Sequence, residues 1–191
     1  MPRDRSRLDM SVDFQPVNIA VLTISDTRTP DDDRSGDLLA ERIAEDGHVL
    51  ASRMIVTDDV DRITARLQDW IEDPQIDVIV TTGGTGLTGR DSTPEAFDQT
   101  VEKAIPGFGE LFRQLSYEKI GTSTIQSRAV AGVAGGTYLF ALPGSPSGCR
   151  DGWDDILRYQ LDIRHRPCNF VEIMPRLTES ASRRRTSPVD A

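Results

Sequence analysis

Residues 17–25 constrain the fold of this chain more than any other part of its sequence. They read VNIAVLTIS, a near-continuous apolar run. Strands with this pattern are buried on both faces, and they occur in parallel sheets that helices cover on either side. The run therefore predicts a central strand that ends at Ser25 and Asp26.

Apolar runs and helical patterns alternate along the rest of the chain. Further strands are expected over residues 49–56, 76–82 and 138–142, and helices over residues 35–46, 60–71, 94–103, 108–120 and 125–134, with a last helix that ends at Leu161. Strands that alternate with helices form βαβ units with right-handed crossovers. The sequence therefore predicts an α/β fold, a three-layer α/β/α sandwich with a mostly parallel sheet.

Short polar residues predict where three of these helices begin. Ser35 can cap the first helix, and Thr57 or Asp58 can cap the second. Residues 92–95, STPE, combine a capping box with proline at an early helical position, which predicts the start of the third helix.

The length of 191 residues suits one globular domain. We expect a flexible N-terminal segment over residues 1–15, the domain over residues 16–177, and a disordered tail over residues 178–191, where apolar residues are few.

The charge and hydropathy of the chain bear on its partners. A formal net charge of −9 argues against nucleic acid, because neutralising phosphates needs clustered lysine and arginine. The basic cluster RRR at 183–185 lies in the Ser/Thr-rich tail and is interpreted as a solvated end. No apolar run is long enough to cross a bilayer, and residues 1–15 lack the apolar core of a secretory signal. We therefore expect a cytoplasmic protein that contacts neither nucleic acid nor membrane.

The cysteines and histidines form no metal or redox motif. Cys149 and Cys168 are too far apart for a zinc site and are interpreted as structural thiols. His48 and His165 have no carboxylate or cysteine partner at ligand spacing. Any metal ion is therefore expected to arrive with a substrate.

The loop after the third expected strand is rich in glycine. Residues 84–89, GTGLTG, match G-x-G-x-x-G. A dinucleotide site would need an acidic residue on a following strand, but Glu110 falls in a helical pattern, which disfavours a nicotinamide oxidoreductase. A P-loop would need Lys and Ser or Thr where Arg90 and Asp91 stand. Two interpretations stay open: backbone amides that approach a phosphate, and a tight turn that needs glycine for positive φ.

Two carboxylates near this loop are candidates for chemistry, because ligands of open α/β sheets bind beyond the carboxyl ends of the strands. Asp58, after the second strand, could reach the same crevice as Asp91, and together they could hold Mg²⁺ on a triphosphate. Asp59 is a rival for that role, and helix capping is an alternative for Asp58 and Asp91.

Two further polar features could contact a ligand. The turn PGSP, which follows the fourth expected strand at 143–146, has exposed amides and the Ser145 hydroxyl and could grip a small polar group. Arg128 begins a small-residue stretch with a helical pattern and could counter an anionic ligand.

Four segments together resemble the MoaB/MogA family of molybdopterin-binding proteins: TTGGTGLTGRD with the following TPEA, GTSTIQSRAVAGV, PGSPSGCR and RHRPCNF. The last three are similar to the MoaB branch in particular. The resemblance covers residues 17–177.

This resemblance implies an α/β sandwich that binds molybdopterin and assembles as a homotrimer, or as a homohexamer in the MoaB branch. In active members the terminal phosphate of molybdopterin attacks the α-phosphate of Mg-ATP and pyrophosphate leaves, without a covalent enzyme intermediate. Mg²⁺, ATP and molybdopterin are thus the implied cofactor and substrates. Such a transfer depends mainly on positioning and on charge neutralisation.

The resemblance also implies roles for particular residues. Asp91 matches the family's catalytic aspartate, and Asp58 aligns with the aspartate of its V-P-D-[DE] pattern, although Thr57 replaces the proline and leaves Asp59 open. The expected binding residues are Ser25, Asp26, Thr82, Gly83, Gly84, Thr85, Gly86, Arg128, Pro143, Gly144 and Ser145. A non-catalytic pterin-binding or scaffold protein is the alternative, since it would keep the glycine loop while the carboxylates only cap helices.

Overall fold

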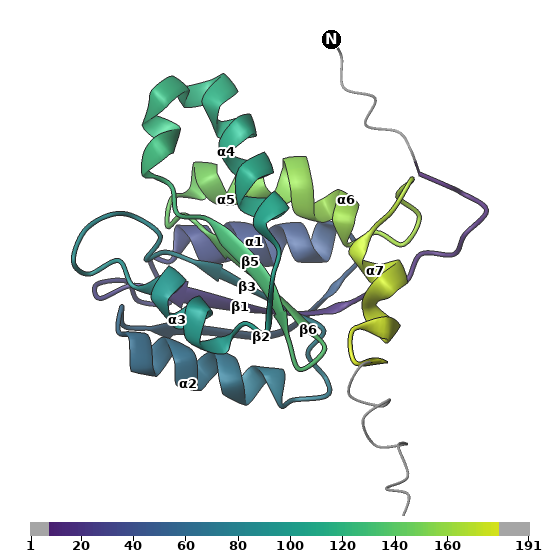
Figure 1. The fold of residues 1–191 in the computed structure, drawn as a ribbon, viewed down its shortest axis with the longest axis horizontal. Coiled ribbons are helices and arrows are strands. Elements are labelled where there is room, and N and C mark those ends of the chain that lie inside the picture. The colour runs from purple at the N-terminus through teal and green to yellow at the C-terminus, as the bar shows by residue number, and fades with distance from the viewer. Residues whose placement is uncertain (1–7, 180–191) are drawn as a thin grey trace, which may run out of the picture.

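A six-stranded sheet lies at the centre of the structure, a computed structural model that describes residues 8–179 (Figure 1). Its strands are β1 (Asn18–Ile24), β2 (Val49–Val56), β3 (Val78–Thr82), β4 (Lys103–Ala104), β5 (Val130–Ala134) and β6 (Thr137–Leu142), and they lie in the order β2-β1-β3-β6-β5-β4. The strands β2, β1, β3 and β6 run parallel, whereas β5 and β4 join antiparallel. The predicted mostly parallel sheet is confirmed.

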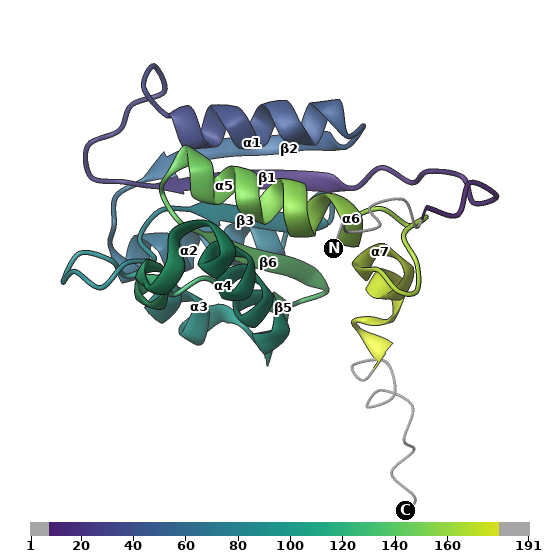
Figure 2. The ribbon, with the colours of Figure 1, turned by 90° about the horizontal axis from the view of Figure 1, so that it is seen from above.

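Helices cover both faces of this sheet because the central strands are apolar on both. One face is covered by α1 (Arg34–Glu45), α4 (Pro106–Ile120) and α5 (Pro146–Gly152), and the other by α2 (Val60–Ile71) and α3 (Thr93–Thr100). In β1, Ile19 and Val21 are buried on the first side, whereas Ala20 and Leu22 are buried on the second. Figure 2 looks onto the layer of α1, α4 and α5. The predicted three-layer sandwich is confirmed.

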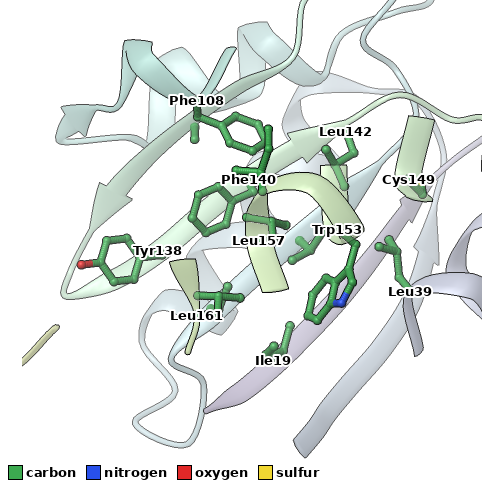
Figure 3. Packing of buried hydrophobic residues seen from close by; sticks show 14 of the residues in the cluster. Ile19, Leu39, Phe108, Tyr138, Phe140, Leu142, Cys149, Trp153, Leu157 and Leu161 are labelled. Atoms are coloured by element: carbon green, nitrogen blue, oxygen red, sulfur yellow. The ribbon is translucent and has the colours of Figure 1, made fainter. Parts of the chain in front are cut away.

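Most of the buried aromatic side chains pack in the first of these layers. Figure 3 shows Trp153 between Ile19 and Leu39. It also shows Phe140 and Tyr138, which belong to β6. The remaining elements are short: η1 (a 3-10 helix, Gly121–Gln126), η2 (a π-helix, Trp153–Leu157), α6 (Arg158–Gln160), α7 (Phe170–Ile173) and η3 (a 3-10 helix, Met174–Arg176).

The helix expected over residues 125–134 is wrong. The chain there leaves η1 and forms β5, which pairs with β6 through the two-residue turn Gly135-Gly136. Both glycines have positive φ, +59° and +94°, as a tight β-hairpin requires. The small residues of this stretch suited a helical spacing, but the Gly-Gly signal for a hairpin decides the structure.

Two helix boundaries also differ from those expected. Asp33, rather than Ser35, caps α1 by accepting a hydrogen bond from the Gly36 amide at 3.0 Å. The helix expected over residues 94–103 ends at Thr100, because Lys103 and Ala104 pair with β5 as the edge strand β4.

The ends of the domain stay partly outside the structure. Residues 1–7 of the expected N-terminal segment and residues 180–191 of the expected tail, including the RRR cluster, lie outside the described residues. At the start of the described residues, Leu8 forms an isolated bridge with His165, and the Asp9 amide donates to the Arg164 carbonyl at 2.8 Å. The domain boundaries stay a prediction. Among residues 8–179, no helix is long and apolar enough to cross a membrane.

The buried His48 is expected to make the stability of the fold depend on pH. Its Nδ1 accepts a hydrogen bond from the Val17 amide at 3.3 Å, which needs the neutral ring. Burial lowers the pKa of His48 below its usual 6.5, although Asp46 and Asp162 oppose the shift. The unfolded chain therefore binds the proton more readily, so this contribution is complete above about pH 6.5 and is lost as the pH falls below it.

We expect the free energy of unfolding of the wild type to fall by about 1 kcal/mol more than that of His48→Leu between pH 7.5 and pH 5.5. Urea unfolding of both proteins at the two pH values measures this difference. Equal pH dependence in the two proteins would contradict the assignment.

Candidate functional site

A cleft of about 800 Å³ opens at the carboxyl ends of β1, β3 and β6. The helix α1 that follows β1 and the helix α3 that follows β3 lie on opposite faces of the sheet, so the cleft is at the point where the chain connections diverge. Open α/β sheets bind ligands at such points. The loops after β1 and β3 extend from this end of the sheet (Figures 1 and 2).

The structure brings most of the predicted site residues together in this cleft. Those that line it are Ser25, Asp26, Asp58, Thr82, Gly83, Gly84, Thr85, Gly86, Asp91, Pro143, Gly144 and Ser145. Arg128 is the predicted site residue that does not line the cleft.

The glycine loop makes a tight turn against the end of β1. Gly83 and Gly84 have φ values of +107° and +63°, which favour glycine. A Cβ atom at Gly83 would lie 2.2 Å from the carbonyl oxygen of Ile24. The Gly83 amide donates to the Leu142 carbonyl at 3.1 Å, and the Thr93 hydroxyl donates to the Gly83 carbonyl at 2.8 Å. The tight-turn interpretation of these glycines is therefore confirmed, and phosphate binding by the remaining amides stays a prediction.

Asp58 and Asp59 separate into two different roles. The Asp59 carboxylate caps α2 by accepting from the Arg62 amide at 3.0 Å, so the expected cap at Thr57 or Asp58 is wrong. The Asp58 carboxylate turns into the cleft instead. Its Oδ1 accepts hydrogen bonds from the Ser92 amide at 3.0 Å and from the Ser92 hydroxyl at 2.5 Å. The structure therefore places Asp58, not Asp59, beside the glycine loop.

Asp91 lies beside Gly86 of the same loop. Its Oδ2 accepts hydrogen bonds from the amide and the hydroxyl of Thr88, both at 2.7 Å. Burial alone would raise the pKa of Asp91, but the bonds from Thr88 and the backbone of Gly86 outweigh it and lower the pKa below its ordinary value. Asp91 is therefore ionised at neutral pH.

The glycines of the loop make room for these two carboxylates. A Cβ at Gly84 would lie 2.8 Å from Oδ2 of Asp58, and a Cβ at Gly86 would lie 2.7 Å from Oδ2 of Asp91. Both approaches are closer than real Cβ contacts. The spacing G-x-G thus sets two carboxylates against alternate residues of one loop.

Asp26 connects the loop after β1 to Arg90 and to Asp58. Its carboxylate accepts hydrogen bonds from Arg90 at 2.7 and 2.9 Å and from the Asp58 amide at 3.1 Å. The bonds from Arg90, followed by that from the Asp58 backbone, lower the pKa of Asp26. Ser25 turns its hydroxyl toward its own loop, where it accepts from the amides of Thr27 and Arg28.

Arg128 supports the glycine loop from outside the cleft. Its guanidinium donates to the carbonyls of Gly86 and Asp91, both at 2.7 Å, and pairs with Glu95 at 2.5 Å. These contacts hold the main chain of the loop in place. The role expected for Arg128, countering an anionic ligand, stays a prediction.

The PGSP turn forms the opposite side of the cleft. The Pro143 carbonyl accepts from the Thr82 hydroxyl at 2.9 Å, and the Gly144 carbonyl accepts from the Ser35 hydroxyl at 2.9 Å. Ser145 caps α5 through the Gly148 amide at 3.1 Å. Cys149 lies buried beneath the turn, where burial raises its pKa to about 11, whereas Cys168 is exposed. The thiol of Cys149 is therefore unreactive, as a structural thiol should be.

A further wall of the cleft was not anticipated from the sequence. It comes from α4, η1, the segment after η1 and α5, and consists of Phe112, Ser116, Lys119, Ile120, Ser123, Thr124, Gln126, Ser127 and Asp151. Lys119 donates to Asp151 at 2.5 Å and to Asp155 at 2.9 Å, which raise its pKa although burial opposes the rise. The segment GTSTIQSRAVAGV contains four of these residues, but its pattern did not predict that they line the cleft, since the wall joins segments that are distant in sequence. Ser92 and Thr88 were also missed, because a capping pattern gave Ser92 another role.

The family model described as "Probable molybdopterin binding domain" matches residues 20–163, more than half of the chain. The chain belongs to this family. All of the cleft residues named above fall within the matched span.

Relatives in the MoaB branch of this family agree in sequence and in structure. Molybdenum cofactor biosynthesis protein B of Escherichia coli (strain K12) is 48% identical over 161 residues, which are 84% of this chain and 95% of that protein. A crystal structure of Molybdenum cofactor biosynthesis protein B has a TM-score of 0.78 at 38% identity and covers 86% of this chain and 98% of the other. The tungsten cofactor synthesizing protein MoaB from Pyrococcus furiosus has a TM-score of 0.67 at 36% identity, with coverages of 75% and 91%. The resemblance to the MoaB/MogA family is confirmed.

Alanine in place of Gly86 is expected to slow any reaction that depends on Asp91. The new Cβ would displace the Asp91 carboxylate without removing it, and a shift of about 1 Å in a reacting group can cost about 100-fold in rate. The measurement is pyrophosphate release from Mg-ATP with molybdopterin present, the reaction that the family resemblance implies for active members. Gly89→Ala is the matched control in the same loop, because a Cβ there meets nothing within 4 Å. Equal rates in the two variants would contradict the expectation.

Proposed function

We propose that this chain acts in molybdenum cofactor biosynthesis and transfers the adenylyl group of Mg-ATP to molybdopterin. The terminal phosphate oxygen of molybdopterin attacks the α-phosphorus of ATP, the bond to the β-phosphate oxygen breaks, and pyrophosphate leaves. Membership of a molybdopterin-binding family supports molybdopterin as a substrate, and the relatives are named as molybdenum cofactor biosynthesis proteins. The pair of carboxylates held against the glycine loop is the observation that carries the proposal.

The charges in the cleft support a nucleotide that arrives with a divalent cation. Asp26, Asp58, Asp91 and Asp151 line the cleft, against the cations Arg28 and Lys119. A triphosphate alone would meet more negative than positive side chains, whereas a triphosphate that carries Mg²⁺ would not.

The donor set fits Mg²⁺ shared with phosphates rather than a metal site of the protein alone. Among residues 8–179, no group of three or more His, Cys, Asp or Glu side chains could hold a metal ion. Mg²⁺ is often bound by one or two carboxylates together with substrate phosphates and water. Asp58 and Asp91 supply those two carboxylates, and the bound ion would neutralise charge as the phosphates approach one another.

The chain's own groups would orient the two substrates. The loop from Gly83 to Gly86 lets the main chain come close to an anion, and the PGSP turn faces it across the cleft. No nucleophile of the protein is needed, because the phosphate of the pterin attacks directly. Positioning and charge neutralisation would then provide the acceleration.

The test is pyrophosphate release from Mg-ATP by the wild-type protein with and without molybdopterin, together with the appearance of adenylylated pterin. We expect release that requires both the pterin and Mg²⁺. Pterin binding without release would sink the transferase and leave the non-catalytic pterin-binding protein.

By the same family likeness we propose a cytoplasmic homotrimer or homohexamer. Light scattering of the purified protein separates these two from each other and from a monomer, and a monomer would contradict the proposed assembly.

A further inference from the structure

The two carboxylates of the cleft are held in the same way, although they come from different elements. One oxygen of each accepts two hydrogen bonds from a single hydroxyl residue, one from its amide and one from its side chain. For Asp58 this residue is Ser92, and for Asp91 it is Thr88. We call Ser92 and Thr88 the hydroxyl clamps.

The Ser92 clamp breaks a local rule of helix formation. Ser92 occupies the N-cap position of α3, yet its side chain accepts no capping hydrogen bond. Its hydroxyl donates across the cleft edge to Asp58, which lies 34 residues earlier in the chain. Capping serines stabilise helices, so the helix forgoes a favourable bond for this contact. Departures of this kind concentrate at functional sites.

Both clamped carboxylates lie close to the glycine loop. Oδ2 of Asp58 accepts no hydrogen bond from the part of the chain that the structure describes, and it lies 2.8 Å from where a Gly84 Cβ would be. For Asp91, the clamped Oδ2 lies 2.7 Å and Oδ1 lies 3.1 Å from where a Gly86 Cβ would be. The clamps thus hold one oxygen of each carboxylate, and both carboxylates line the cleft.

We propose that Ser92 and Thr88 are positioning residues, which fix the orientation of Asp58 and Asp91 so that their other oxygens meet a magnesium-bearing nucleotide. The proposal rests on the proposed function. A freely rotating carboxylate loses conformational freedom when it binds a cation, and the clamps remove that cost in advance. They touch neither substrate, since they act through the two aspartates.

The test measures ATP affinity by calorimetry in excess Mg²⁺ and in excess chelator, without pterin, so that no turnover is needed. The ratio of the two affinities is the gain due to Mg²⁺. Ser92→Ala and Thr88→Val each remove one charge-assisted hydrogen bond and keep the amide, so each is expected to lower the gain about tenfold. The affinity in chelator is expected to stay within about twofold, because the clamps act on the cation.

Conservative variants separate positioning from a structural effect. Ser92→Thr and Thr88→Ser keep the hydroxyls and are expected to retain the gain within about twofold. Thr100→Ala is the matched control, since it removes a hydroxyl bonded to the Ala96 carbonyl of the same helix at 2.7 Å, away from the cleft. Its gain is expected to equal that of the wild type.

The outcomes distinguish this inference from the proposed function. An unchanged gain in Ser92→Ala and Thr88→Val, or an equal loss in Ser92→Thr and Ser92→Ala, overturns the clamps alone. A wild type with no gain overturns both the clamps and the magnesium nucleotide site. A normal gain that the clamp variants lose, without any pyrophosphate release, overturns the transferase and supports the clamps.

Discussion

Alanine in place of Asp58 or of Asp91 is expected to reduce pterin-dependent pyrophosphate release by about 1,000-fold, because each removes charge stabilisation at the transferring phosphates. Both carboxylates line the cleft, and the hydrogen bonds from Ser92 and Thr88 hold them in place. Steady-state measurement of pyrophosphate at saturating Mg-ATP gives the rate.

Asp59→Ala is the matched control for this prediction. Its carboxylate is adjacent in sequence but caps α2 through the Arg62 amide. Loss of that cap is expected to lower the free energy of unfolding by about 1 kcal/mol and to leave the rate nearly unchanged. A rate lost equally in Asp58→Ala and Asp59→Ala would point to damage to the loop rather than to lost charge.

A second variant separates the charge of Asp58 from its hydrogen bonds. Asp58→Asn keeps a side-chain oxygen that can accept from Ser92 but carries no charge. If Asp58 only anchored the first turn of α3, this variant would remain active. The proposed function expects it to be about as slow as Asp58→Ala, since neutralising charge is what the site supplies.

The parts of this structure that depend on local sequence patterns could be predicted from the sequence. The run at 17–25 and the apolar stretches at 49–56, 76–82 and 138–142 predict strands because their burial is continuous. Once those strands are parallel, their carboxyl ends must share one edge. The meeting of Ser25, Gly83 and Pro143 in one cleft therefore follows from the sequence.

The parts that could not be predicted depend on contacts between distant segments. A shift of one residue along the chain after β2 would place Asp59 in the cleft instead of Asp58. No local sequence pattern predicts which of the two positions the structure adopts. Ser92 stands at the position of a helix cap, but its hydroxyl donates to Asp58, which is distant in sequence. Residues 130–134 have the spacing of a helix, yet their pairing with β6 makes them a strand.

Asp33→Ala is expected to lower the free energy of unfolding by about 3–5 kcal/mol, because it removes a buried carboxylate and leaves its three hydrogen-bond donors on Thr23, Gly36 and Arg53 without that acceptor. The Asp33 side chain is fully buried, and its Oδ2 accepts from Arg53 at 2.7 Å and from the Thr23 hydroxyl at 2.8 Å. Its Oδ1 caps α1 through the Gly36 amide. Urea unfolding with an unchanged m-value measures the loss.

Asp37 provides the control, because it pairs with the same arginine in a different environment. Arg53 donates to the Asp37 carboxylate at 2.7 Å, the same distance as to Asp33, but the Asp37 side chain is 60% exposed. Exposed pairs contribute at most about 1 kcal/mol, so Asp37→Ala is expected to cost no more than that. Equal losses in the two variants would mean that burial does not set the strength of this pair.

Asp33→Ala is also expected to change ligand binding in the cleft, through the first turn of α1. Asp33 fixes the first turn of the helix, and that turn carries Ser35, whose hydroxyl donates to the Gly144 carbonyl of the PGSP turn. Loss of the cap frees this turn, so the affinity for Mg-ATP should fall in Asp33→Ala even at temperatures where the protein stays folded. Ser35→Ala removes only the last of these bonds, so it should reproduce the change in affinity without the large loss of stability. An affinity that changes in Asp33→Ala but not in Ser35→Ala would show that the helix acts on the cleft by another path.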